Sequence, residues 1–414
     1  MYRVVVTGMG VISPVGNDVD TFWNNLKNGV CGIDKISRFD ASGLKVHLDA
    51  EVKDFQPKNY YDTMQEIRRS DLYMQYAMAA SKEAVEQSGI LESDLDRERL
   101  GVYIGSGIGG IGTTVNEVRK LDEKGPERVS PFFVPMMISN MAAGAVAIKF
   151  GAKGPTLPVV TACATSTHTI GEAYRAIKHG YADAIIAGGS EASINELSMA
   201  GFINCQALNL AEDPKEGSLP FDKRRAGFVM GEGAGILILE EYEHAKKRGA
   251  TIYAEVTGYG NTSDAYHITA PDPEGDGAIR AIKMAVEESG ITDADNIYVN
   301  AHGTGTHLND AMETKAIKTV FGEKAYDIHI SSTKSMTGHM MGATGAVEAI
   351  ASVLALKEGV IPPTINYKEK DEECDLDYTV NQALCADVDY AISTSLGFGG
   401  HNACIAFKKI DAQK

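Results

Sequence analysis

Residues 83–107 read EAVEQSGILESDLDRERLGVYIGSG, and residues 284–306 read MAVEESGITDADNIYVNAHGTGT. Both stretches pass from a helical pattern through an acidic loop into an apolar strand that is followed by glycines. Both also contain AVE and SGI at the same spacing. Strands that alternate with helices are typical of parallel β-α-β units. The repetition therefore predicts an α/β protein that is built from two related halves.

A second pair of similar stretches follows the first pair in each half. Residues 159–180 (VVTACATSTHTIGEAYRAIKHG) and 328–359 (IHISSTKSMTGHMMGATGAVEAIASVLALKEG) each run from a strand through small residues into a helix. Each helical pattern has Lys or His in its last turn and stops at a glycine, which is a typical helix end. We therefore expect the same strand and helix to occur twice.

The boundary between the halves is expected near residue 250, after the strand AGILILEEYE and the charged run HAKKRG. This predicts an N-terminal half at 1–250 and a C-terminal half at 251–414. The first half carries an additional excursion at about 108–157, which contains the apolar segment SPFFVPMMISNMAAGAVAIKFG. No low-complexity linker appears, so the halves are expected to pack tightly.

The composition limits the possible partners. The chain has 414 residues, 44% of them apolar, and a net charge of −17. That charge argues against nucleic acid or an anionic membrane as the main partner, and no segment approaches the roughly 20 apolar residues of a membrane span. Six scattered cysteines without a C-x-x-C pair indicate neither a zinc site nor a disulfide framework. They favour a cytoplasmic protein in a reducing environment.

Two glycine-rich stretches could form either a ligand-binding loop or an ordinary turn. GSGIGG at 105–110 matches the G-x-G-x-x-G pattern of dinucleotide-binding proteins. Its counterpart in the second half, AHGTGT, does not keep that pattern, so a dinucleotide site is disfavoured. GFVMGEGAGILIL at 227–239 is predicted to form a tight turn between strands.

Three reactive side chains follow predicted strands of the two halves and occupy matching places: Cys163, His302 and His339. Loops at the carboxyl ends of parallel strands are where α/β proteins build their sites. Cys163 is expected near the amino end of a helix, where the helix dipole lowers the pKa of a thiol. A thiolate attacks thioesters and esters to give an acyl-enzyme.

Each of these residues also has an ordinary interpretation. A free cysteine is often a small buried hydrophobe, and a single loop histidine is usually structural. The coincidence of three such residues on corresponding loops favours catalysis. Three other histidines lie nearby in the sequence, and spacing does not exclude them: His168, His307 and His401.

Four motifs carry a family resemblance. They are TACATSTHTI at 161–170, NAHGTGT followed by ND at 300–310, SSTKSMTGHMMGATGAVE at 331–348, and LGFGGHNACIAF at 396–407. In that order they closely resemble the β-ketoacyl-[acyl-carrier-protein] synthases of the elongating type, and the resemblance covers essentially the whole chain. It implies a thiolase fold, in which two duplicated halves form five layers (α-β-α-β-α), and a homodimer.

The resemblance also implies a mechanism. Cys163 would accept an acyl group from a carrier-protein thioester. Malonyl-carrier protein would then lose CO2, and its enolate would attack the acyl-cysteine to give a 3-oxoacyl product two carbons longer. Two imidazole N–H groups, from His302 and His339, would hold the enolate oxygen. No cofactor of its own is implied, because phosphopantetheine arrives on the carrier protein.

Further residues match the family's site. Lys334 would tune the protonation of the histidines, and Glu348 would offset the burial of its charge; an ordinary loop-to-helix ion pair is the alternative. The backbone N–H groups of Cys163 and Phe398 resemble an oxyanion hole, and Phe398 resembles a gate to the acyl pocket. The hydroxyl groups expected to bind phosphopantetheine are those of Thr304 and Thr306.

The acyl pocket and the docking surface follow from the same resemblance. Ile108 would form the pocket floor and Phe202 its wall, with Phe133 contributed by the second subunit, although plain core packing is the commoner fate of such residues. Carrier protein is acidic, like this chain, so docking requires a local basic patch. The residues that match the docking position are Arg68 and Arg69, with 223–225 and 246–248 as alternatives.

Some positions depart from the family pattern. His307 stands where proline is usual, and Leu396 stands where Phe is frequent. Thr394 replaces a frequent Asn near a proposed monovalent-cation site, so no metal is predicted. FDKRRAGF, at 221–228, lacks the usual acidic residue before its glycine.

Several functions were compared. An elongating synthase of type II fatty acid biosynthesis is favoured, and the same chemistry in a polyketide pathway stays open. A non-catalytic chain-length factor is disfavoured by the intact cysteine and histidines. A thiolase or an initiating synthase is disfavoured because TGHMMGA supplies His where those enzymes need Cys or Asn. A dehydrogenase rests on GSGIGG alone.

Overall fold

The computed structural model describes residues 1–410. Its strands form a ten-stranded sheet in the order β10-β9-β13-β14-β8-β1-β7-β6-β4-β5. The ten strands are β1 (Val4–Ile12), β4 (Leu100–Gly105), β5 (Thr156–Leu157), β6 (Ala184–Glu191), β7 (Gly233–Glu241), β8 (Ala254–Ser263), β9 (Ile297–Asn300), β10 (His329–Ser331), β13 (Tyr390–Gly397) and β14 (His401–Lys408).

The sheet consists of two equivalent sets of five strands. In the first set β4, β5 and β6 are parallel and β7 is antiparallel to β6. In the second set β9, β10 and β13 are parallel and β14 is antiparallel to β13. The sets meet where β1 pairs with β8 over three residues of each strand, Val4–Val6 and Ala254–Val256. This short seam makes one continuous sheet of the two halves.

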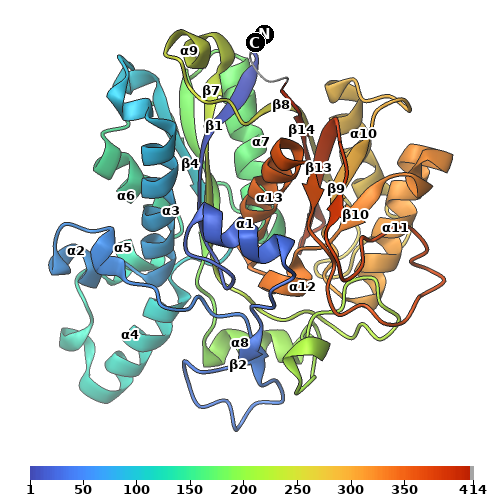
Figure 1. The fold of residues 1–414 in the computed structure, drawn as a ribbon. Coiled ribbons are helices and arrows are strands. Elements are labelled where there is room, and N and C mark those ends of the chain that lie inside the picture. Colours follow the sequence, from blue (N-terminus) through green and yellow to red (C-terminus); the bar gives the residue numbers. More distant parts are fainter. Residues whose placement is uncertain (411–414) are drawn as a thin grey trace.

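Helices complete the five layers predicted for the fold (Figure 1). The six helices of the layers are α3 (Leu72–Ser88) and α6 (Met141–Phe150) outside the first set, α10 (Asp276–Ser289) and α11 (His307–Phe321) outside the second set, and α7 (Thr165–Lys178) and α13 (Thr344–Glu358) between the sets. Nearly every residue of α13 is buried, including its Ser and Thr side chains. A helix that is buried on all sides belongs in the middle of a structure, so the layered α/β architecture is confirmed.

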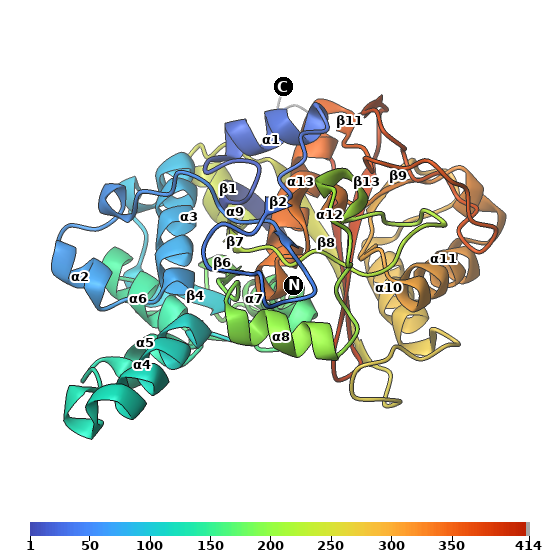
Figure 2. The same ribbon diagram turned by 90° about the horizontal axis from the view of Figure 1, so that it is seen from below.

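The remaining elements surround this core. They are α1 (Val19–Lys27), α2 (Met64–Arg68), α4 (Ile111–Lys124), α5 (Phe133–Met137), α8 (Glu196–Asn204), α9 (Tyr242–Lys247), α12 (Lys334–Thr337), β2 (Asp34–Lys35), β3 (Leu48–Asp49), β11 (Val360–Ile361) and β12 (Leu384–Cys385). Figure 2 shows that α4 and α5, from the predicted excursion, project from one side of the molecule. In residues 1–410, no helix combines the length and apolar character needed to cross a bilayer.

The repeat seen in the sequence is confirmed in detail. Helices α3 and α10 both end at a glycine in the left-handed conformation, Gly89 and Gly290, which favours glycine. Each helix also packs backbone to backbone on its strand. A side chain at Gly10 of β1 would collide with the carbonyl of Ala80, as one at Gly260 of β8 would collide with that of Ala281.

The starts of α7 and α13 show the same correspondence. A short 3-10 turn precedes each helix, at Ala162–Ala164 and at Met341–Ala343. The first residue of each turn has a positive φ, 51° for Ala162 and 47° for Met341. Cys163 follows β5 and His339 follows β10, so the two residues lie on corresponding loops, as expected. Within these loops they are not equivalent, because the residue at the position of Cys163 is Gly342 and His339 precedes it by three residues.

The predicted turn at 227–239 is wrong. β7 begins only at Gly233, and residues 227–232 hold isolated bridges and no turn. They form isolated bridges to distant segments, among them Met230 to His339 and Gly231 to Ala50. The glycines allow this segment to pass close to other backbone, and a side chain at Gly231 would meet the carbonyl of Thr337.

Candidate active site

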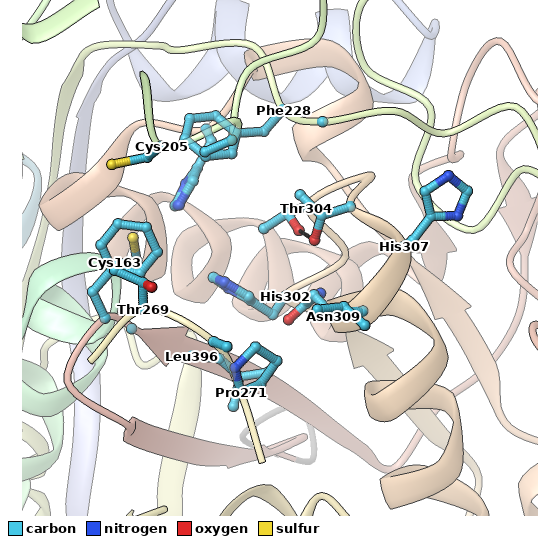
Figure 3. A pocket seen from close by; sticks show the side chains of 18 of the residues that line it. Cys163, Cys205, Phe228, Thr269, Pro271, His302, Thr304, His307, Asn309 and Leu396 are labelled. Atoms are coloured by element: carbon cyan, nitrogen blue, oxygen red, sulfur yellow. Dashed lines mark hydrogen bonds between the residues drawn. The ribbon is translucent and has the colours of Figure 1, made fainter. Parts of the chain in front are cut away.

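A cavity of about 400 Å³ lies where loops from both halves converge (Figure 3). It is mostly apolar, with polar groups on one side. The residues predicted from the sequence that line it are Cys163, Phe202, His302, Thr304, Thr306, His339 and Phe398. The structure therefore brings the proposed nucleophile, both histidines, the gate and the two threonines into one space.

Cys163 lies in the 3-10 turn before α7 and is partly exposed to the cavity. The positive φ of Ala162 bends the chain sharply in front of it, and the Thr161 N–H donates to Thr165 Oγ1 at 2.9 Å. Gly397 packs against this turn, since a side chain there would meet the backbone nitrogens of Cys163 and Ala164. The nucleophile is thus held on a rigid corner.

The expectation that the helix lowers the pKa of Cys163 is wrong in this structure. Burial raises the pKa of the Cys163 thiol to about 12, and the carboxylate of Glu191 adds to the increase. The charge of Lys334 and the N–H groups of Cys163 and Phe398 act in the opposite direction. Desolvation outweighs these stabilising groups, so the free protein holds a thiol rather than a thiolate.

The two histidines face each other across the cavity. Their ring centroids are 5.5 Å apart and the rings are perpendicular. Burial lowers the pKa of His302 well below its usual value, with further lowering by Lys334 and His339. Burial and Lys334 do the same to the pKa of His339. Both imidazoles are therefore neutral at pH 7, and each carries one N–H donor.

Lys334 and Glu348 form a buried ion pair behind the histidines, with Nζ and Oε1 2.5 Å apart. Lys334 begins α12 and Glu348 lies on α13. Burial raises the pKa of Glu348 to about 7, against the lowering effect of the lysine. The ammonium group of Lys334 places a positive charge near both imidazoles, and Glu348 is its buried partner, as the family resemblance implied.

The segment around Phe398 is held against the cavity by hydrogen bonds. Asp264 N–H donates to the Gly400 carbonyl at 2.9 Å, and Asn402 Nδ2 donates to Asp264 Oδ1 at 2.7 Å. The Phe398 ring lies 6.3 Å from that of Phe202. Because both rings line the cavity, this segment covers the approach to Cys163.

Three residues of the site were not predicted. Glu191 is fully buried beside Cys163, and its carboxylate accepts from the N–H groups of Gly107, Ile108 and Gly342. Glu313, on α11, accepts from the His302 N–H at 2.7 Å. The Phe228 ring lies edge-on to His339 at 5.0 Å. A carboxylate at the end of an apolar strand, as in GGSEA, is the signal that could have indicated Glu191.

Other predicted residues lie away from this cavity. Ile108 is 41% exposed and Phe133 is partly buried on α5, and neither lines the cavity of the single chain. Arg68 and Arg69 are exposed, and the Arg69 guanidinium stacks on Phe132 at 4.2 Å. Of the three alternative histidines, His307 lines the cavity mouth, whereas His168 and His401 lie outside its lining.

A cysteine that shares a cavity with two histidines, at the junction of two duplicated halves, places the chain among the condensing enzymes with a thiolase fold. The chain belongs to the β-ketoacyl synthase family. Family models for the β-ketoacyl synthase N-terminal and C-terminal domains match residues 1–245 and 253–368.

Curated relatives match over the whole chain. A 3-oxoacyl-[acyl-carrier-protein] synthase 2 of Staphylococcus aureus is 53% identical over 410 residues, which is 99% of both chains. One of Synechocystis is 51% identical over 408 residues, or 98% of both. A solved β-ketoacyl synthase from Burkholderia phymatum is 34% identical, with a TM-score of 0.92 over 99% of this chain and 100% of the other.

Another solved relative is a ketosynthase of a type II polyketide pathway, in complex with its acyl carrier protein. It is 36% identical, with a TM-score of 0.91 over 99% of this chain and 100% of that chain. The family match removes the dehydrogenase that GSGIGG suggested.

Proposed function

We propose that the chain is an elongating 3-oxoacyl-[acyl-carrier-protein] synthase of type II fatty acid biosynthesis. The observation that carries the proposal is the cavity in which Cys163 meets two neutral imidazoles, those of His302 and His339. A polyketide pathway is less favoured, since identity is 53% to the 3-oxoacyl synthase of Staphylococcus aureus and 36% to the polyketide ketosynthase.

The first step is an exchange of thioesters. The Cys163 sulfur attacks the acyl carbonyl of acyl-carrier protein, the bond to the pantetheine sulfur breaks, and the thiol proton passes to the departing sulfur. The N–H groups of Cys163 and Phe398, which act on the cysteine sulfur, stabilise the charge that develops on the carbonyl oxygen. Cys163 then carries the acyl group.

The second step begins with loss of CO2 from malonyl-carrier protein. The electron pair of the broken carbon–carbon bond forms an enolate, whose oxygen accepts hydrogen bonds from His302 and His339. A neutral imidazole suits this role, because it donates without giving up its proton. The enolate carbon attacks the acyl-cysteine, the carbon–sulfur bond breaks with its electron pair on the sulfur, and the Cys163 thiolate takes up a proton from solvent. Burial, with the charge of Lys334 as the second cause, keeps both imidazoles neutral.

Acyl carrier protein is the proposed partner. The Staphylococcus and Synechocystis relatives are named for it, and the polyketide ketosynthase binds its own carrier protein. Arg68 ends α2 and Arg69 caps it; both are exposed, and no ion pair of either is found within residues 1–410. These exposed guanidinium groups, one of them stacked on Phe132, offer a local basic docking patch on a chain with net charge −17. Thr304 and Thr306, whose hydroxyls lie 3.0 Å apart at the cavity, would hold the phosphopantetheine.

We also propose a homodimer. β5 lies at the edge of the sheet, and its Leu157 is 51% exposed. An exposed edge strand with apolar side chains favours pairing with a second copy. In such a dimer Phe133 of one subunit would reach the acyl pocket of the other, next to Ile108. A cytoplasmic location, no metal and no resident cofactor complete the proposal.

The proposal is tested by reconstitution. Purified protein is incubated with acyl-carrier proteins of graded chain length and with malonyl-carrier protein, and the products are identified by mass. The expected product is 3-oxoacyl-carrier protein two carbons longer than the acyl substrate. Cys163→Ala serves as the control and should give none. Absence of an elongated product from every acyl length, by a protein that is folded, would refute the proposal.

A further inference from the structure

Thr344 is placed to orient one of the two histidines. Its Oγ1 lies 3.0 Å from Nδ1 of His339, and both side chains are buried to about 2% exposure. Thr344 is the first residue of α13. It does not line the cavity, so it would act on the reaction only through His339.

The backbone of His339 is fixed on both sides. Its N–H donates to the Val229 carbonyl at 2.7 Å, and its carbonyl accepts from the Gly231 N–H at 2.8 Å. The ring lies between Phe228 and His302, at centroid distances of 5.0 and 5.5 Å. What these contacts leave undetermined is which ring nitrogen carries the single proton of the neutral imidazole.

The duplicated half shows that Thr344 has a distinct task. Thr165 occupies the same position at the start of α7, and its hydroxyl accepts the Thr161 N–H at 2.9 Å, within its own turn. Within residues 1–410, the hydroxyl of Thr344 has His339 Nδ1 as its single hydrogen-bond partner. The hydroxyl of Thr165 therefore stabilises the turn that holds Cys163. The hydroxyl of Thr344, at the equivalent position, contacts the imidazole of His339.

The direction of this hydrogen bond follows from burial. A buried hydroxyl proton without an acceptor is costly, whereas an unused hydroxyl lone pair is not. Because Nδ1 is the acceptor within reach, the Thr344 hydroxyl donates to it. Nδ1 is then unprotonated, and the proton lies on Nε2. His302 has no such partner, since its buried Nδ1 has no hydrogen bond within the described residues.

We propose that Thr344 is a positioning residue that fixes His339 as the Nε2–H tautomer, so that its N–H donor is available for the enolate oxygen in malonyl decarboxylation. The identity of that oxygen rests on the proposed function. The tautomer of His339 does not depend on that function. The acyl transfer to Cys163 does not use His339 in this scheme and should not depend on Thr344.

The test compares two substitutions at this position. Thr344→Val has nearly the same shape and no hydroxyl, and Thr344→Ser keeps the hydroxyl. Outright removal of one donor to a developing charge lowers kcat by about 10²- to 10³-fold. Thr344→Val leaves the imidazole in place and only allows its proton to move between the two nitrogens, so it should lower kcat for decarboxylation by less, about 10- to 100-fold. KM for malonyl-carrier protein and the acylation of Cys163 should stay unchanged. Thr344→Ser should retain most of the wild-type rate.

A matched control accounts for the loss of any buried threonine hydroxyl. Thr7, on β1, is equally buried and donates to Glu240 at 2.8 Å, away from the cavity. Thr7→Val should decarboxylate at the wild-type rate. A wild-type rate in Thr344→Val, or an equal loss in Thr344→Ser, overturns the assignment.

A spectroscopic measurement decides the tautomer without substrate. With histidine labelled by ¹⁵N, the shifts of the two ring nitrogens identify the protonated one, and His339→Gln assigns the signal. Wild-type protein and Thr344→Ser should show the proton on Nε2, and Thr344→Val should show a mixture. A proton on Nδ1 in the wild-type protein would refute the inference, even if the enzyme proved to act on another substrate.

Discussion

The buried pair of Lys334 and Glu348 allows a quantitative prediction. Lys334→Met removes the positive charge and leaves the carboxylate of Glu348 without its partner. Glu348 is only 1% exposed, so water cannot replace the lost partner. Breaking a buried pair from one side costs about 3–5 kcal/mol. For 414 residues the unfolding entropy is about 0.9 kcal/mol/K, so the melting temperature should fall by about 3–6 °C.

The size of this loss should depend on pH. The pKa of Glu348 is raised to about 7 in the folded protein, mainly by burial, so its contribution to stability is present below its unfolded pKa and is lost as pH rises through 7. Without Lys334 that pKa rises further. The difference in stability between wild type and Lys334→Met should therefore grow from pH 6 to pH 8.5, by at most about 1.4 kcal/mol per pH unit.

The assay is thermal unfolding of both proteins at pH 6.0, 7.2 and 8.5, followed by circular dichroism. The control is the double variant Lys334→Met with Glu348→Met, which removes both charges. Replacing a buried pair by apolar groups of similar volume is often neutral, so the double variant should recover most of the lost stability. If the double variant were as unstable as the single one, or the loss did not change with pH, the reasoning about the buried carboxylate would be refuted.

Three further predictions concern catalysis. Cys163→Ala should abolish the acyl adduct seen by intact-protein mass after incubation with acyl-carrier protein, and an adduct at the wild-type level would exclude Cys163 as the nucleophile. His302→Ala and His339→Ala should each keep that adduct but release little labelled CO2 from malonyl-carrier protein, because both donate to the enolate oxygen; normal release by either variant would remove that residue from the mechanism. Ile108→Phe should reduce the rate with dodecanoyl-carrier protein by about 10- to 100-fold more than with hexanoyl-carrier protein, because overpacking blocks the long chain. Equal losses on both substrates would show that Ile108 supports the fold.

The fold could be predicted because the same helix, loop and strand pattern occurs in both halves of the sequence. The spacing of AVE and SGI predicts that α3 is followed by β4 and α10 by β9, as the structure shows. What could not be predicted was the seam between β1 and β8, because strand pairing over three residues leaves no pattern in the sequence.

The sequence identified the main residues of the site but not their pKa values. Motifs located Cys163, His302 and His339, and the structure puts them in one cavity. The pKa of Cys163 was predicted in the wrong direction, because desolvation is set by surrounding layers that a local helix argument does not include. Glu313 and Phe228 were missed for a similar reason, since both reach the site from segments whose local patterns are ordinary.

The positions of α7 and α13 have a consequence for how the protein folds. Each helix packs on strands of both sets, α7 on β6 and β14 and α13 on β7 and β13. Either half alone would expose a face of its own central helix that the other half covers. Neither half therefore has a closed core, and we expect the two to melt in a single cooperative transition. If each half had a closed core of its own, the two halves could unfold independently. Here each half completes the hydrophobic core of the other, so neither is expected to be stable alone.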